Sequence, residues 1–142
     1  MTSSQRDVSP PQGGTPPPAI AELPNGERLL LTPLAAEIGR RFYAEFPDEL
    51  DRYGPAGRDW CQHDNQWLLA WAVEDLAVGG THFASNVRWL AGLLRARGYP
   101  VERLGRDLEI AGDVVAEEGA AFAEVAARLR RGARLLRGRS RR

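Results

Sequence analysis

The sequence predicts an all-α protein, an antiparallel bundle of four or five helices that follows a disordered, proline-rich N-terminal leader. From Leu29 onward, apolar residues recur every three or four positions, which is the period of one helix face. Almost no stretch alternates apolar and polar residues with the period of two that is typical of half-buried strands. Glycine and proline interrupt the helical pattern often, so short loops between antiparallel neighbours are expected.

A chain of 142 residues is long enough to form one hydrophobic core but not two. We expect three parts: a leader over residues 1–26, a helical bundle over 27–137 and a basic tail over 138–142. The leader holds six of the ten prolines, mixed with Ser, Thr, Gln and Gly. Such a segment buries too little apolar surface to offset the entropy lost on ordering, which predicts disorder.

The first helix is expected to begin at Thr32 and Pro33, because threonine is a favoured N-cap and proline is favoured at the first helical position. Pro47 disfavours helical backbone at the preceding Phe46, so the helix should break there. A short turn should follow over residues 48–53.

Gly54, Pro55 and Gly57 separate that turn from a second helix, expected over residues 57–78. This helix is apolar nearly all round over residues 67–73, a pattern typical of a central, buried helix.

A third helix is expected between Thr81, as its cap, and Gly98, with Pro100 just beyond as a stop signal. A fourth should begin at Val101 and end near Gly119.

The fifth helix, expected over residues 122–136, enters a strongly basic end. Eight of the nineteen arginines lie in residues 128–142, where there is no acid, and the preceding 127 residues carry a net charge of −8. We expect residues 128–137 to be helical and docked, with their arginines facing acids of the body. A nucleic-acid-binding tail is the alternative, but the tail has no aromatic residue to stack on a base.

The composition favours a cytoplasmic protein that does not span a membrane. The longest apolar run, residues 67–73, is far shorter than the roughly 20 residues that a membrane-spanning helix needs. The polar, proline-rich first 18 residues do not resemble a secretion signal. A single cysteine forms no internal disulfide, so nothing points to an oxidising compartment.

The sequence offers little for metal binding or catalysis. Cys61 and His63 are two positions apart on a helix and point in different directions, while His82 lies beyond the next turn. Cys61 lies near a helix start, where the helix dipole would lower its pKa somewhat. There is no phosphate-binding glycine loop, nucleophile elbow or glycosidase-like pair of carboxylates. We therefore expect no metal site and no enzyme.

The tryptophans are the most informative residues for function. Trp60, Trp67 and Trp71 are spaced i, i+7 and i+11, which places them on one face of the central helix, and Trp89 is on the partner helix. Such a row of indoles could line a slot for a flat ligand between facing helices. A tryptophan row at this spacing more commonly fills the core, or forms a patch that a partner subunit covers.

Two acids, Asp64 and Asp75, are expected on the same face as the tryptophans. A carboxylate on a buried face needs a partner, and Arg88 or Arg95 is the expected one.

Residues 32–115 resemble a helical-bundle family of bacterial sensor proteins, found beside cobalamin-binding and signal-transduction modules in actinobacteria and their relatives. The family pattern runs roughly FPxLxxRYGxxGRxxCxxD, a helix, a glycine turn, LFxxYVxWxxxLLxxRGxP and a further leucine-rich helix. The matching residues here are Phe46, Pro47, Arg52, Tyr53, Gly54, Gly57, Arg58, Cys61, Asp64, Trp89, Arg97 and Gly98.

The resemblance implies a role in sensing or interaction. Where the family has a Tyr-His pair on the central helix, this chain has Trp67 and Leu68, so a histidine contact to a cofactor is not expected. The cobalamin-binding domain, with its alternating strands and helices, also has no counterpart in this sequence, and we expect the helical module alone.

The leading hypothesis is a non-enzymatic module of a signalling or regulatory system that binds a partner protein, or a second copy of itself, through the Trp-rich face. The second is a sensor that binds a small hydrophobic ligand, of tetrapyrrole or corrin type, on the same face. The third is a nucleic-acid-associated regulator that uses the arginine tail. The proposed binding residues are Trp60, Asp64, Trp67, Trp71 and Trp89. No cofactor is required by the sequence.

Overall fold

The protein is an all-α bundle, as the sequence predicts. The computed structural model describes residues 11, 14–79 and 82–140. The described helices are α1 (Leu31–Glu45), α2 (Asp48–Val78), α3 (His82–Ala96), α4 (Val101–Ala116) and α5 (Ala123–Ser140), with a 3-10 turn at Ala120–Phe122. A small hairpin, β1 (Ile20–Glu22) and β2 (Arg28–Leu30), precedes them. None of the described helices combines the length and the apolar character that crossing a membrane requires.

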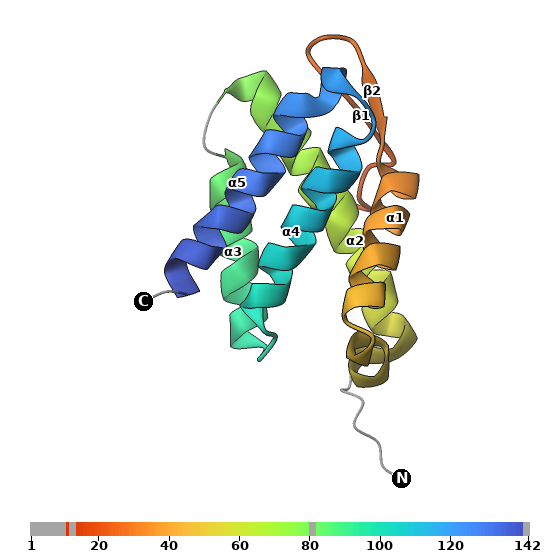
Figure 1. Ribbon diagram of the computed structural model, residues 1–142, viewed down its shortest axis with the longest axis vertical. Coiled ribbons are helices and arrows are strands. Elements are labelled where there is room, and N and C mark those ends of the chain that lie inside the picture. Colours follow the sequence, from red (N-terminus) through yellow and green to blue (C-terminus); the bar gives the residue numbers. More distant parts are fainter. Residues whose placement is uncertain (1–10, 12–13, 80–81, 141–142) are drawn as a thin grey trace.

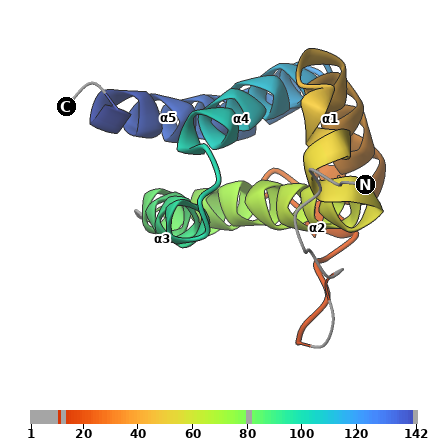
Figure 2. The same ribbon diagram turned by 90° about the horizontal axis from the view of Figure 1, so that it is seen from below.

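The helices form two layers (Figures 1 and 2). Helices α4 and α5 lie side by side in one layer, α2 and α3 form the other, and α1 closes one edge by packing on both α2 and α4. Helix α3 packs on α2 and α5 but only loosely on α4. The two layers are therefore held together more tightly at the α1 edge than between α3 and α4.

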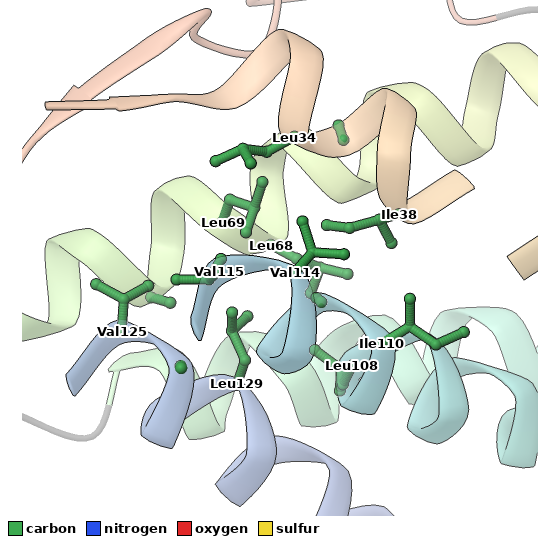
Figure 3. Close-up of a cluster of buried hydrophobic side chains, with 14 of the residues drawn as sticks. Leu34, Ile38, Leu68, Leu69, Leu108, Ile110, Val114, Val115, Val125 and Leu129 are labelled. Carbon is green, nitrogen blue, oxygen red and sulfur yellow. The ribbon is translucent and has the colours of Figure 1, made fainter. Parts of the chain in front are cut away.

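The core lies between these layers (Figure 3). Leu34 and Ile38 of α1 meet Leu68 and Leu69 of α2, and the apolar face of α4 and α5 completes the cluster. The buried positions of each helix recur three or four residues apart. The residues that form the periodic apolar pattern in the sequence are therefore the ones that pack in the core.

The hairpin is a departure from the expected leader. Residues 20–26 were expected to be disordered, but β1 pairs antiparallel with β2 and places Leu23 and Leu29 in the core. The strands are three residues each, too short for a period of two to be read from the sequence. The rest of the expected leader described here, residues 11 and 14–19, has no regular secondary structure.

Helix α1 begins two residues earlier than expected and without the expected threonine cap. Its N-cap is Leu30, which makes no side-chain capping bond, and Thr32 lies inside the helix. The Thr32 hydroxyl instead accepts a hydrogen bond from Gln66 Nε2 of α2, at 3.4 Å. A tertiary contact therefore replaces the local cap.

The expected turn over residues 48–53 is helical. It forms the first part of α2, and the break falls at Gly54, whose backbone is left-handed (φ 67°, ψ −165°). Pro55 then resumes the helix, consistent with the preference of proline for a first helical turn. At Gly57, a Cβ atom would lie 2.4 Å from Tyr53 Cβ, so only glycine allows this close approach.

The later boundaries lie close to the predicted ones. Helix α2 ends at Gly79, which is left-handed (φ 62°), and α4 begins directly after Pro100. The proposed cap Thr81 is outside the described residues. Helix α4 ends at Ala116, three residues before the predicted Gly119.

The sequence analysis expected Arg88 or Arg95 to pair with Asp75, and this expectation is wrong. Asp75 faces α5, where Arg128 Nε donates to its Oδ2 at 2.7 Å, and it also accepts a bond from the Phe83 amide at 3.2 Å. Desolvation acts to raise the pKa of Asp75, but these bonds outweigh it and the pKa is lowered. The buried carboxylate thus joins α2, α3 and α5.

Other arginines of α5 also face acids of the body. Arg130 pairs with Asp113 at 2.9 Å, and Arg137 pairs with Glu109. The expectation that the helical part of the tail docks on the acidic body is met at these positions.

We predict that Leu29→Ala lowers the free energy of unfolding by about 2–5 kcal/mol, the usual cost of truncating a buried leucine. Leu29 is 1% exposed, whereas its neighbour Leu30 is 52% exposed. Leu30→Ala is therefore the matched control and should cost less than about 0.5 kcal/mol. Urea denaturation of both variants measures the difference. Equal, small losses would show that the hairpin does not contribute to the core.

We predict that Asp75→Asn costs about 3–5 kcal/mol, because it leaves the Arg128 charge partly buried without its partner. Asp113→Asn removes a similar but exposed pair with Arg130 and should cost less than about 1 kcal/mol. Thermal and urea unfolding would compare the two variants. A loss for Asp75→Asn no larger than that for Asp113→Asn would contradict a structural role of Asp75.

Candidate functional site

A cleft of about 1060 Å³ lies between α2, α3 and α4, with α1 contributing to one wall. It occupies the region where α3 packs only loosely on α4, between the two layers seen in Figure 2. The residues that line it are Phe42, Tyr43, Glu49, Tyr53, Gly57, Trp60, Cys61, His63, Asp64, Asn65, Trp67, Leu68, Trp71, Trp89, Leu90, Leu93, Leu94, Ala96, Arg97, Tyr99, Arg103, Leu104 and Asp107.

All five residues proposed from the sequence line this cleft: Trp60, Asp64, Trp67, Trp71 and Trp89. Trp60, Trp67 and Trp71 are partly buried, and the rings of the last two are stacked with centroids 6.2 Å apart. Trp89 is different, since it is 62% exposed. The tryptophan row is thus neither fully buried core nor an open surface patch.

The row follows from the two-sided character of α2. Leu68, Leu69 and Ala72 face the core, while the tryptophans occupy the adjoining face and line the cleft. Leu68 belongs to both surfaces. Residues 67–73, which are apolar on nearly all sides of the helix, therefore lie partly in the core and partly along the cleft.

One end of the cleft is held by a polar network at the start of α2. Arg103 of α4 donates to Glu49 Oε2 at 2.7 Å and to Asp48 Oδ2 at 2.9 Å. The Tyr99 hydroxyl donates to the same Glu49 oxygen at 3.0 Å, and the Tyr99 ring packs on Tyr53. The network fixes the α3–α4 turn against the first part of α2.

We call the part of the cleft lining formed by Cys61, Asn65 and Asp107 the inner end. The Asn65 amide nitrogen donates to the Cys61 carbonyl at 3.0 Å and to Asp107 Oδ1 at 3.3 Å. The Asn65 side-chain oxygen is buried and accepts no hydrogen bond. A buried polar atom without a partner typically costs about 1–3 kcal/mol.

Two aspartates that line the cleft have pKa values raised by burial. Burial is the main cause that raises the pKa of Asp107 to about 7; the Asn65 bond acts to lower this pKa, and the charges of Asp64 and Glu49 act to raise it. Burial also raises the pKa of Asp64, against its contact with His63. No cation is among the groups that act on Asp107.

Cys61 departs from the expected lowering of its pKa by a helix dipole. Burial and the nearby carboxylates raise the pKa of this thiol well above its ordinary value. Cys61 lies beyond the break at Gly54, within the second part of α2 and away from its first turn. The thiol is therefore a poor nucleophile at neutral pH.

The structure brings none of the candidate metal ligands together. His63 contacts Asp64, with Nδ1 and Oδ1 3.1 Å apart, and packs edge-on against Trp60, while His82 lies at the start of α3. Among the described residues no three His, Cys, Asp or Glu side chains are grouped to hold a metal ion.

The sequence analysis did not single out Asn65, Asp107, Glu49, Tyr99 or Arg103. A signal was present for two of them, since Asn65 and Asp107 are polar residues at positions that continue apolar helical stripes. Asp107 lies three residues after Leu104, and Asn65 three before Leu68. A polar residue in such a stripe indicates a buried polar contact or a site.

Comparisons with known protein families, curated proteins and solved structures give no match, so the function is argued from this cleft.

We predict that Asp107→Asn changes stability in a pH-dependent way. The pKa of Asp107 is higher in the folded state than in the unfolded state, so native stability falls as pH rises from about 4 to about 7 and stays lower above that. A rise from 3.8 to about 7 corresponds to as much as about 4 kcal/mol. Asparagine does not ionise. The free energy of unfolding of the variant should therefore rise relative to that of the natural protein between pH 4 and pH 8.

Urea denaturation of both proteins at several pH values measures this gain. Asp113→Asn, on the exposed side of the same helix, is the control and should show no comparable pH-dependent gain. A stability difference between Asp107→Asn and the natural protein that does not change with pH would contradict the raised pKa.

Proposed function

We propose that this protein binds a small, largely apolar molecule in the cleft between α2, α3 and α4, and that binding is the sensing step of a regulatory system. The observation that carries the proposal is the position of Trp60, Trp67 and Trp71 along one wall of a cleft of about 1060 Å³. Ligand pockets typically measure about 300–1,000 Å³ and are lined by apolar and aromatic side chains with a few polar groups. This cleft has that composition.

The tryptophan wall favours a ligand with a flat face. The rings of Trp67 and Trp71 are stacked, inclined by 30° to one another, and both line the cleft. Offset stacking on such a surface adds to the gain from burial alone. A tetrapyrrole or corrin fits this description, as do smaller aromatic molecules.

The proposal is one of binding rather than catalysis. The raised pKa of Cys61 makes its thiol a weak nucleophile, and His63 is engaged with Asp64 and Trp60. The similarity to helical sensor modules, carried by residues such as Tyr53, Gly54 and Asp64, also supports a sensing role.

A second candidate, binding of a partner protein or a second copy of this chain, is favoured by Trp89. Its side chain is 62% exposed on α3, and tryptophan is enriched among the residues that dominate interface energies. Under this candidate, Trp89→Ala would abolish self-association or partner binding in sedimentation experiments.

Nucleic-acid binding has less support. Arg128, Arg130 and Arg137 of α5 already pair with acids of the body, which leaves less positive charge for phosphates.

We predict that the neutral fluorescent probe N-phenyl-1-naphthylamine binds saturably, with one molecule per chain, and quenches tryptophan fluorescence. Trp67→Leu should weaken this binding by about tenfold, because it removes one ring of the stacked pair. Probe emission and tryptophan quenching measure the dissociation constant.

The matched control is Val78→Ala, which removes an exposed apolar side chain from the same helix outside the cleft. It should leave the dissociation constant within about twofold, a change of less than about 0.5 kcal/mol. Probe binding that is unsaturable, or that Val78→Ala weakens as much as Trp67→Leu does, would overturn the proposal.

A further inference from the structure

We infer that the ligand of the cleft carries a cationic, hydrogen-bond-donating nitrogen, as in an amine or amidine on an aromatic body, and that this nitrogen binds the Asp107 carboxyl at the inner end. The inference rests on the proposed function and adds the chemical class of the ligand.

The first observation is the unsatisfied acceptor. Asn65 is 2% exposed, and its amide nitrogen is used by the Cys61 carbonyl and Asp107. Its side-chain oxygen has no donor, and it is the only buried side-chain polar atom of the described residues in that state. Buried polar groups in native proteins are nearly always hydrogen-bonded, and the unsatisfied oxygen shows that acceptors outnumber donors at the inner end.

The second observation is the balance of donors and acceptors. The Tyr99 hydroxyl and the Arg103 guanidinium are engaged with Glu49. The Asp107 carboxyl accepts one bond from Asn65 and has the capacity to accept another, and the Tyr43 hydroxyl, which also lines the cleft, can donate or accept. A ligand that supplies donors therefore suits the inner end better than one that supplies acceptors.

The third observation is the sign of the local charge. Asp107 is 7% exposed, and the charged groups that act on it are Asp64 and Glu49, both acidic. Arg103 is paired with Glu49 and Asp48, and Arg97 acts on Asp64. A cation at the inner end would neutralise a buried carboxylate, whereas an anion would be repelled.

The fourth observation is the aromatic wall that leads to this end. The faces of Trp67 and Trp71 carry negative quadrupole potential, which attracts cations, and tryptophan does so most strongly. Aromatic rings combined with carboxylates are the chemistry by which proteins recognise organic cations. The apolar lining, such as Leu90 and Leu94, accommodates the body of the molecule.

Three probes that share one ring system and differ in the headgroup test the inference: 2-naphthylmethylammonium, 2-naphthylmethanol and 2-naphthoate. Tryptophan quenching at neutral pH and fixed ionic strength gives each dissociation constant with the full chain. We expect the ammonium to bind at least tenfold more tightly than the alcohol, which corresponds to about 1.4 kcal/mol, and the carboxylate to bind most weakly.

The variant Asp107→Asn should reduce the ammonium-to-alcohol preference to less than threefold, because it removes the charge that distinguishes the two headgroups. Asp113→Asn makes the same chemical change on the same helix, at an exposed position outside the cleft, and should retain the full preference. The comparison of probes on the natural protein needs no variant, so it tests the inference even if Asp107→Asn fails to fold.

The outcomes separate the two proposals. Tight alcohol binding without a preference for the ammonium overturns the cationic ligand and leaves the binding cleft standing. A preference that persists in Asp107→Asn overturns the role of Asp107. If none of the three probes binds, both the inference and the proposed function fail.

Discussion

The carboxylate of Asp75 joins three helices at one point, because it accepts a bond from the first turn of α3 and pairs with Arg128 of α5 while standing on α2. This contact positions α3 against α2 and α5, and α3 in turn makes little contact with α4. At the other end, Arg103 and Glu49 tie α4 to the start of α2. These two buried ion pairs fix the relative positions of the helices that surround the cleft.

Two buried aspartates illustrate how environment decides the state of a carboxyl group. Asp75 has an arginine and a backbone amide as partners, and its pKa is lowered. Asp107 has only the Asn65 amide, and burial raises its pKa to about 7. The arrangement at Asp75 contributes to stability. The arrangement at Asp107 reduces stability and leaves the Asp107 carboxyl as an acceptor in the cleft lining. Uncompensated polar groups of this kind are most often found where a protein binds something.

Much of the candidate site could be predicted from the sequence, because Trp60, Asp64, Trp67 and Trp71 lie on a single helix. Helix geometry alone places such residues on one face. The inner end could not be predicted in this way, since Asn65 and Asp107 are 42 residues apart and meet only when α2 and α4 are packed. The partner of Asp75 was missed for the same reason, since Arg128 is 53 residues away and belongs to α5.

The sequence by itself determined the all-α class, the positions where most helices begin and end, and the existence of a tryptophan face. These features depend on periodicity and on the backbone preferences of glycine and proline, which act within a few residues. The tertiary structure decided which buried aspartate pairs with an arginine. It also decided that residues 20–30 form a hairpin on the core and that a cleft between α3 and α4 is lined by the tryptophans. Those outcomes depend on contacts between distant segments, whose energies are set only once the layers are packed.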